Sequence, residues 1–467
     1  MLDFRGLVAT LETRGELRRV SKRVDARYEL AALMAELDRE RKAFIFENVA
    51  GAKFPLVGGL LNRWECYGWA LGTRPGEPFT AADLAARLEA TQARSMPPRV
   101  VQDGPVKERV LRDEAINLAD LPAPTAFEFD SGAFITAACG ISRNPHTGQL
   151  NVGIYRTQVL GRDTMTVSAN ASSDLHLFYD YAEQHGQSMP IALAIGVEPA
   201  LMMAAVCKLP TDRSELDLAG ALQGKPIDLV KCETSDLLVP ANAEIVIEGR
   251  VDCSRKVVNT LGEFVGQYGT DTAPVAQVTA ITHRRDAMYY AILAGRNPEH
   301  NTLGSVAGLS FRRALEHALR QQLPHVKDLH VYLSPALGAM MHVVIAISKK
   351  NDAEPMALIN AAFKAPLTIA GIEMPVERIT KRIIVVDDDI NVHDLEDVEW
   401  AQWNRAAAAD KVRVLPDVAS WNLERCAKPG RGSFRLAVDA TSDMVDRDAL
   451  RRTRIPGAET IRLADYQ

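Results

Sequence analysis

From about residue 110 to residue 295 the sequence is built from short apolar runs that are separated by glycine, proline and asparagine. The runs include AFITAACGIS, LNVGIYRTQVLG, PIALAIG, EIVIEGRV and PVAQVTAITH. Short runs that are rich in β-branched residues and bounded by turn-forming residues are typical of β-strands. The sequence therefore predicts a β-rich domain in the middle of the chain.

The segments on either side mix helical and strand-like patterns. The Ala/Leu spacing of TAADLAARLEATQ, residues 80–92, predicts a helix, and the proline-rich MPPRVVQDGPVKE after it marks a connector. The segment GLSFRRALEHALRQQ, residues 308–322, predicts another helix. Beyond it, the apolar runs VVIAIS and RIIVVDDD alternate with helical patterns, which predicts an α/β arrangement.

A chain of 467 residues is too long for one ordinary core, so two or three domains are expected. The fold class is predicted to be α/β and multi-domain. The pattern changes divide the chain into an N-terminal α/β domain over 1–108, a β-rich domain over 109–300, a linker helix over 301–325, an α/β C-terminal domain over 326–440 and a tail over 441–467.

Composition excludes several classes of protein. A net charge of -6 without a long basic run gives no field that would attract nucleic acid. No apolar stretch reaches the roughly 18 residues of a membrane span, and the first twenty or so residues indicate an amphipathic helix, not a signal peptide. The 6 cysteines form no CxxC pair, which opposes a zinc cage and indicates a reduced, cytoplasmic compartment.

Several polar residues interrupt the apolar central region. Asn151 and Arg156 flank the strand-like NVGIYR, and their odd spacing places them on opposite faces unless a bulge or strand end intervenes. An exposed charge at a strand edge is the plainer interpretation of Arg156. His176 and Glu215 lie near predicted helix starts, where capping and the helix dipole explain such residues without a metal.

Two further acidic positions are candidates. Glu263 stands between Gly262 and Gly266 among apolar and aromatic residues, surroundings that suit a general acid, although a solvated turn explains it equally well. The triplet DDD at 387–389 follows an apolar strand, where aspartates commonly act as caps, so we assign no site there. The residues by themselves predict a multi-domain protein with a candidate Asn/His/Glu metal site.

The blocks GAFITAACGISRNPHTGQLNVGIYR, PIALAIGVEPA, LVKCETSDLLVPANAEIVIEG and VVDDDINVHDLEDVEWA, taken together, resemble the UbiD family of decarboxylases. The segment RLAVDAT at 435–441 is similar to a KLGIDAT-like segment of that family. Their order and spacing over most of the chain make the resemblance specific. It implies that the central domain is a split-barrel-like flavin-binding domain.

The resemblance implies the decarboxylation of a small aromatic or heteroaromatic acid with prenylated FMN, and leaves the reverse carboxylation at high CO2 open. It also implies a divalent metal such as Mn2+, a K+ ion, a flavin prenyltransferase that supplies the cofactor, and a homo-oligomer, dimeric or hexameric. The site is expected in a cleft between the flavin domain and the C-terminal domain. Two alternatives stay open: a non-catalytic UbiD-like subunit of a larger decarboxylase, and an oxidoreductase with plain FMN.

The resemblance also implies roles for individual residues. Asn151, His176 and Glu215 match the metal ligands of the family, although His176 lies a couple of residues further along than the pattern implies, which indicates a small insertion. Arg156 matches the arginine that orients the carboxylate, and Glu263 matches the glutamate that donates the proton. Ile154 is expected to line the flavin, Cys207 and its neighbouring carbonyls to bind K+ together with Glu215, and Arg435 to take the place of a phosphate-binding lysine.

The sequence departs from the family pattern where a second glutamate commonly precedes the proton donor by about five residues. Here the segment 257–261 reads VVNTL and holds no carboxylate. We therefore expect Glu263 alone to pair with Arg156 until substrate binds, and Val258 to make that wall apolar, in favour of a bulky or flat aromatic acid. The absent glutamate favours the non-catalytic alternative, whereas the retained Arg156 and Glu263 oppose it.

Overall fold

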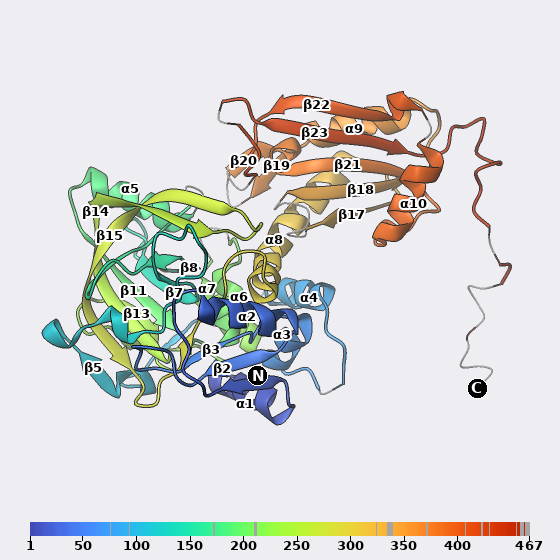
Figure 1. Cartoon of the computed structure of the whole chain (residues 1–467). Helices are drawn as coiled ribbons and strands as arrows, with labels where there is room; N and C mark the ends of the chain where they lie inside the picture. The colour runs from blue at the N-terminus through green and yellow to red at the C-terminus, as the bar shows by residue number, and fades with distance from the viewer. Residues whose placement is uncertain are drawn as a thin grey trace. The chain divides into compact units, whose positions relative to one another are not determined.

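The computed structural model describes residues 1–462 except positions 75, 93, 171–172, 210–212, 324, 334–339, 370–371, 407, 422–423, 429, 454 and 458–461. The chain divides into two compact units, Met1–Ser310 and Phe311–Gln467 (Figure 1). The first unit contains the predicted N-terminal and central domains around one hydrophobic core that extends from Phe4 to Leu309. No described helix combines the length and the apolar character that a membrane span requires.

The N-terminal part of the first unit is a small α/β arrangement, as predicted. Its elements are α1 (Phe4–Thr13), β1 (Leu17–Val20), α2 (Glu29–Arg39), β2 (Ala43–Phe46), β3 (Leu56–Gly58), α3 (Trp64–Ala70) and α4 (Ala81–Gln92). The strands pair in the order β1-β2-β3-β16, where β16 is Tyr289–Tyr290. Because β16 comes from much later in the chain, this sheet ties the N-terminal part to the end of the central domain.

An antiparallel sheet of seven strands fills the central part. Its strands are β5 (Arg109–Leu111), β7 (Ala138–Arg143), β8 (Leu150–Ile154), β10 (Thr164–Thr166), β11 (Met189–Ile195), β14 (Ile245–Gly262) and β15 (Tyr268–His283). They pair in the order β10-β15-β14-β11-β7-β8, and β5 pairs with β15. Bulges at Glu248/Gly249 and Asp252/Lys256 interrupt the long β14–β15 hairpin. Since bulges bend and twist a strand, the sheet curls into the half-barrel that the fold class predicted (Figure 1).

Short elements connect and flank this sheet. They are η1 (Pro105–Lys107), η2 (Asp113–Ala115), η3 (Leu118–Asp120), the strands β4 (Arg99–Val100), β6 (Phe134–Ile135), β9 (Thr157–Gln158), β12 (Asp228–Lys231) and β13 (Leu238–Pro240), and the helices α5 (Asp174–Gln184), α6 (Pro199–Ala205) and α7 (Glu215–Gln223). Ser173 caps α5 and Ser214 caps α7, each through its side-chain oxygen. The helix starts predicted near His176 and Glu215 are therefore present.

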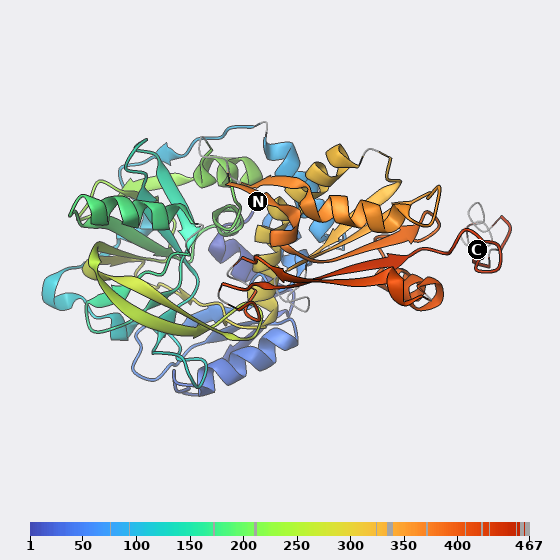
Figure 2. The same ribbon diagram turned by 90° about the horizontal axis from the view of Figure 1, so that it is seen from above.

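The second unit is a mixed α/β sheet with the strand order β17-β18-β21-β23-β22. Its elements are β17 (Asp328–Tyr332), β18 (Met341–Ile347), α9 (Glu354–Lys364), β19 (Pro366–Ile369), β20 (Ile372–Pro375), η5 (Val376–Arg378), β21 (Thr380–Asp387), α10 (Leu395–Arg405), η6 (Ala409–Lys411), β22 (Val412–Val418) and β23 (Ser433–Ala440). Alternate residues of the central strands pack against α9 on one face and α10 on the other (Figure 2). Helix α8 (Pro298–Gln322) runs from the first unit into the second, as predicted for a linker helix.

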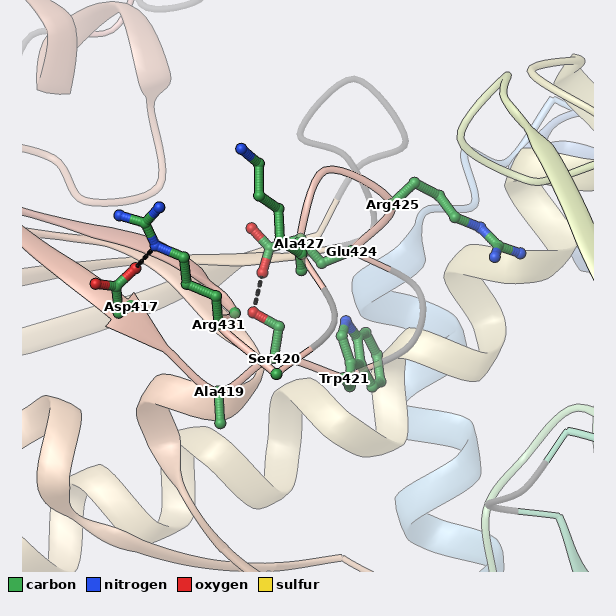
Figure 3. Close-up of a pocket in the computed structure, with 11 residues that line it drawn as sticks. Asp417, Ala419, Ser420, Trp421, Glu424, Arg425, Ala427 and Arg431 are labelled. Carbon is green, nitrogen blue, oxygen red and sulfur yellow. Dashed lines mark hydrogen bonds and ion pairs between the residues drawn. The ribbon is translucent and has the colours of Figure 1, made fainter.

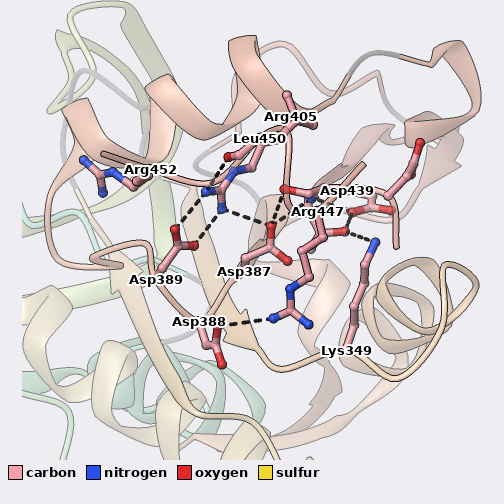
Figure 4. A network of polar contacts seen from close by, with 12 residues as sticks. Lys349, Asp387, Asp388, Asp389, Arg405, Asp439, Arg447, Leu450 and Arg452 are labelled. Atoms are coloured by element: carbon pink, nitrogen blue, oxygen red, sulfur yellow. Dashed lines mark hydrogen bonds and ion pairs between the residues drawn. The ribbon is translucent and has the colours of Figure 1, made fainter. Parts of the chain in front are cut away.

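The aspartate triplet closes the carboxyl end of β21 without a metal (Figure 4). The guanidinium of Arg405, on α10, donates to Asp387 at 3.0 Å and to Asp389 at 2.7 Å, and Arg405 is only 3% exposed. Ser442 donates to the same oxygen of Asp387. A buried arginine thus supplies the positive charge that these two carboxylates need, and both serve to hold α10 against the end of β21.

Candidate active site

One cavity in the first unit collects most of the residues that the sequence singled out. It has a volume of about 360 Å³. The predicted residues that line it are Asn151, Ile154, Arg156, Cys207, Glu215 and Glu263. They come from β8 and the residues just after it, from the segment between α6 and α7, from the start of α7 and from the turn after β14. Only the tertiary fold brings them together.

Asn151 and Arg156 face the same cavity despite their odd spacing because a strand ends between them. Strand β8 ends at Ile154, and Arg156 lies beyond it, before β9. Both side chains therefore line the same cavity although they are five positions apart. The interpretation of Arg156 as an exposed edge charge does not hold, because its side chain is only 16% exposed.

Arg156 binds two carboxylates. Its guanidinium forms one ion pair with Glu263 and a second with Asp271, the latter at 2.7 Å. Burial by itself would lower the pKa of Arg156, but the charges of Glu263 and Asp271 outweigh it and the pKa is raised. Arg156 is thus a permanent cation at the wall of the cavity.

The expectation that Glu263 alone would pair with Arg156 is wrong, because Asp271 pairs with Arg156 as well. Asp271 lies on β15, directly opposite Asn259 of β14. The second carboxylate is therefore supplied from the opposite strand of the hairpin, at the level where β14 carries an amide. The expectation that Val258 forms an apolar wall of the site is also wrong. Val258 is 60% exposed and does not line the cavity.

Glu263 stands on the tight turn that joins β14 to β15. The turn is closed by a hydrogen bond from the Glu263 N–H to the Gln267 carbonyl at 2.7 Å and by one from the Gly266 N–H to the Glu263 carbonyl at 2.8 Å. Gly266 has φ +83°, a conformation that favours glycine. In addition, Asn301 of α8 donates to the Phe264 carbonyl at 3.1 Å. Glu263 is thereby held on a fixed turn beside Arg156, not on a freely solvated loop.

Asn151 and Glu215 lie together at another wall of the cavity. A Glu215 carboxylate oxygen accepts from the Val152 N–H at 3.1 Å, which ties the start of α7 to β8. The amide nitrogen of Asn151 donates to the Tyr155 hydroxyl at 3.2 Å. Burial raises the pKa of Glu215 to about 7, and the negative charge of Asp174 adds to this shift. Among the described residues no group of three or more His, Cys, Asp or Glu could hold a metal by itself, so a metal here would also need the Asn151 amide oxygen.

His176, the predicted third ligand, is not brought into this cavity. Its side chain is 39% exposed, and its Nε2 lies 3.8 Å from a carboxylate oxygen of Asp180. The α5 residue that does line the cavity is Asp174. Two positions along a helix rotate a side chain by about 200°, so one helix cannot present both residues to the same wall.

Ile154, Cys207 and the segment before Cys207 line the same cavity. Ile154 ends β8 and lines the cavity. Ala205, Val206 and Cys207 line it as well, at the carboxyl end of α6, where helix carbonyls lack partners within the helix. The Cys207 thiol donates to the Met203 carbonyl at 3.3 Å.

Arg435 lies on β23 in the second unit and is fully buried there. Its guanidinium donates to the carbonyls of Glu377, Phe434 and Ala419, to Oγ of Ser420 and to a carboxylate oxygen of Glu424. A guanidinium has five N–H donors, and these five contacts engage them within the unit. These contacts give Arg435 a structural role within the second unit, and its phosphate-binding role stays a prediction.

We expect Arg435→Lys to lower stability without loss of flavin. Lysine has three donors, so part of the buried set around Glu424 loses its partner, which would lower the free energy of unfolding by about 1–3 kcal/mol. Denaturant unfolding and the flavin content of the purified protein are the measurements. Loss of flavin with an unchanged free energy of unfolding would instead restore the phosphate-binding role.

A second cavity, of about 450 Å³, lies within the second unit between β22 and β23 (Figure 3). Its charged groups engage one another, since Arg431 pairs with Asp417 at 2.7 Å and Ser420 donates to Glu424. None of the residues predicted for the active site lines this cavity. We therefore take the cavity of the first unit as the candidate active site.

Sequence reasoning missed His300, which lines the same cavity from the start of α8. The Nδ1 atom of His300 lies 3.0 Å from the Gly295 carbonyl, so this nitrogen carries the proton in the neutral ring. Burial lowers the pKa of His300 and favours that neutral form. No local pattern marks the residue, because it stands in a helix almost forty positions after Glu263.

Comparison with known proteins agrees with the geometry. Three domain models of one enzyme, 3-octaprenyl-4-hydroxybenzoate carboxy-lyase, match the chain in order: the N-terminal domain over residues 8–83, the Rift-related domain over 99–297 and the C-terminal domain over 305–440. An uncharacterized protein of Synechocystis sp. is 29% identical over 464 residues, which cover 94% of this chain and 89% of that protein.

Solved structures resemble the chain over its whole length. The UbiD-class enzyme HmfF from Pelotomaculum thermopropionicum, in complex with FMN, is 36% identical, with a TM-score of 0.82 over 99% of this chain and 100% of that one. An evolved dimeric form of HmfF, in complex with prFMN, is also 36% identical, with a TM-score of 0.78 over 100% of both chains. The vanillic acid decarboxylase of Sedimentibacter hydroxybenzoicus is 26% identical, with a TM-score of 0.77 over 98% of this chain and 96% of that one.

Proposed function

The chain belongs to the UbiD family of carboxy-lyases, and we propose that it removes CO2 from an aromatic or heteroaromatic carboxylic acid with prenylated FMN as its cofactor. The observation that carries the proposal is the ion pairing of Arg156 with Glu263 and Asp271 at the wall of the cavity. A fixed cation is suited to bind a substrate carboxylate. A neighbouring carboxyl group is suited to move a proton.

The cavity fits the cofactor in its chemistry. Ile154, Leu261, Ile292, Ala294 and Ala307 supply an apolar lining that suits a flat ring system. Asn151 and Glu215 supply oxygen ligands at the other wall, which suit a hard divalent cation that faces a phosphate. Prenylated FMN, when bound, would accept the electron pair that is left as CO2 departs. The structures of HmfF in complex with FMN and of its evolved dimeric form in complex with prFMN support this assignment.

Arg156 would bind and orient the substrate. Its two partners differ in their placement, since Asp271 lies within strand β15 and Glu263 lies on the turn. The substrate carboxylate would therefore take the place of Glu263 at the guanidinium, while Asp271 keeps Arg156 in position. This exchange would leave the carboxylate beside Arg156 and free Glu263 to face the ring carbon.

Glu263 would then complete the reaction. Loss of CO2 leaves the ring carbon in need of a proton, and a protonated Glu263 would deliver it. In the overall change one carboxylate and one proton are consumed, the bond from the ring carbon to the carboxyl carbon breaks, and CO2 and the neutral ring with hydrogen at that carbon are released. Glu263 would regain its proton from water, which it can reach because its side chain is 18% exposed.

The alternative of a non-catalytic subunit loses its main support. It depended on the absence of a second carboxylate near Arg156, and Asp271 supplies one. The alternative of a plain-FMN oxidoreductase predicts turnover without a prenylated cofactor. The remaining parts of the proposal are Mn2+ and K+ as ions, a flavin prenyltransferase as supplier, a homo-oligomeric dimer or hexamer, and a cytoplasmic location.

We expect activity to depend on prenylation of the flavin. Expressed without a flavin prenyltransferase, the protein should be inactive or hold plain FMN. Co-expressed with one, it should release CO2 from at least one member of a panel of aromatic and heteroaromatic acids, because the electron sink is then present. Mass spectrometry of the released cofactor and CO2 detection are the measurements. Full turnover with no flavin, or with plain FMN alone, would contradict the proposal.

A further inference from the structure

We infer that Asp174, in place of His176, completes a metal site with Asn151 and Glu215, and that this site has only oxygen ligands. The inference rests on the proposed function, which implies a divalent ion beside the cofactor. It assigns that ion a ligand set without imidazole.

A third cavity, of about 540 Å³, adjoins the candidate active site and is lined by residues of α5, of the loop before β8 and of the start of α7. Asn151, Asp174 and Glu215 are the residues that line both cavities. They therefore form the wall between the two spaces, and each can present oxygen atoms to the opening that they share. Ser173, as the cap of α5, fixes Asp174 as the first residue of the helix.

The oxygen atoms of this wall have few donors among the described residues. Asn151 is 8% exposed, and among the described residues no group donates to its amide oxygen, since its only side-chain hydrogen bond runs from the amide nitrogen to Tyr155. Glu215 is also 8% exposed, and one oxygen of its carboxylate accepts from the Val152 N–H, while its own backbone N–H acts on the carboxylate as well. Asn151 and Glu215 thus stand nine-tenths buried at the wall of both cavities, where the Asn151 amide oxygen has no donor among the described residues. Amide and carboxylate oxygens in such a position suit a hard cation.

The carboxylate of Asp174 likewise makes no hydrogen bond or ion pair with a described residue. Asp174 lines the same two cavities as Glu215, so two carboxylates share one wall. A divalent ion bound at this wall would balance their negative charge.

His176 cannot take the same place in this structure. It lines neither cavity, and its imidazole faces Asp180 on the exposed side of α5. Replacement of an imidazole by a carboxylate changes the preferred ion. Carboxylate and amide oxygens suit Mg2+ and Mn2+, whereas imidazole suits Zn2+, Cu2+ and Ni2+. The site is therefore expected to select a hard ion and to discriminate against Zn2+ more strongly than a site with histidine.

The test measures Mn2+ binding and requires no turnover. The full chain, stripped of metal with a chelator, is titrated with Mn2+ in the presence and absence of FMN, and free Mn2+ is followed by electron paramagnetic resonance. We expect Asp174→Asn, which keeps the size of the side chain, to weaken Mn2+ binding by at least about 10- to 100-fold, since loss of even an outer-shell partner can cost that much. The matched control, His176→Ala two positions later on α5, should bind Mn2+ within about twofold of the parent.

A third variant tests the ligand chemistry. Asp174→His keeps a ligand at the position, so it should retain metal binding while shifting the preference from Mn2+ toward Zn2+, as measured by competition and elemental analysis. Loss of Mn2+ binding in His176→Ala with retention in Asp174→Asn would overturn the inference. So would unchanged binding in both variants. Because neither readout involves decarboxylation, failure of the proposed reaction would leave these results interpretable by themselves.

Discussion

Glu263→Gln is expected to abolish most turnover while flavin, metal and substrate binding persist. The amide keeps the size of the side chain and still accepts a hydrogen bond from Arg156, but it cannot cycle a proton. Removal of a general acid typically lowers a rate by about 10²- to 10⁴-fold, and we expect kcat to fall by that amount. KM should stay the same or fall, because a neutral side chain competes less with the substrate carboxylate for Arg156.

The measurements are steady-state CO2 release and hydrogen–deuterium exchange at the ring carbon of the product. Glu183→Gln is the matched control, because Glu183 pairs with Lys256 of the same hairpin at 2.6 Å yet lies on the surface. That exposed pair contributes at most about 1 kcal/mol, so the control should keep the parent kcat. A parental exchange rate in Glu263→Gln would show that another group, such as His300, delivers the proton.

The fold could be predicted from local patterns because its strands are locally distinctive. The runs IALAI and EIVIEGRV are short, β-branched and bounded by turn residues, and they became β11 and the start of β14. The parallel strands β18 and β21 are near-continuous apolar runs, as expected for strands covered on both faces. Helix α8 begins at Pro298, ten residues before the segment 308–322 that the sequence predicted to be helical. The pattern did not reveal these first turns because they carry small and polar residues.

The candidate site could be predicted only in part, because its geometry depends on register. Asp271 meets Arg156 because β15 pairs with β14 at Asn259, and two bulges set that register. A one-residue slip reverses which face a side chain occupies, and no local pattern reveals a bulge. The second carboxylate therefore lies on β15, whereas the family pattern expects it on β14.

The predicted roles of His176, on a helix, and of Arg435, in a buried strand, depend on contacts that a local sequence pattern does not reveal. His176 and Asp174 are two residues apart, and only the cap at Ser173 determines which of them faces the cavity. Arg435 was assigned by its place in a segment, but the loop between β22 and β23 supplies Ser420 and Glu424 as internal partners. Whether a charged side chain serves a ligand or the fold depends on such partners, which lie far away in sequence.

Arg156→Gln is expected to cause a loss as large as that of Glu263→Gln, for two combined reasons. It removes the cation that would bind the substrate carboxylate, and it leaves Glu263 and Asp271 facing each other without a positive charge. Truncation of one partner in a buried, hydrogen-bonded charge pair costs about 2–5 kcal/mol. With a factor of ten for each 1.4 kcal/mol or so, kcat/KM should fall by about 30- to 4,000-fold. The melting temperature should fall as well.

The double variant Arg156→Gln/Asp271→Asn separates these two reasons. Asp271→Asn removes one of the carboxylates that lost their partner, so the double variant should recover much of the melting temperature of the parent. It should not recover kcat/KM, because the carboxylate-binding cation is still absent. Asp271→Asn alone should lower kcat/KM by about 10- to 100-fold, since a hydrogen bond to a charged group contributes about 1.5–3 kcal/mol. If the double variant instead regained turnover together with stability, Arg156 would serve only to neutralise the two carboxylates, and its role in substrate binding would have to be given up.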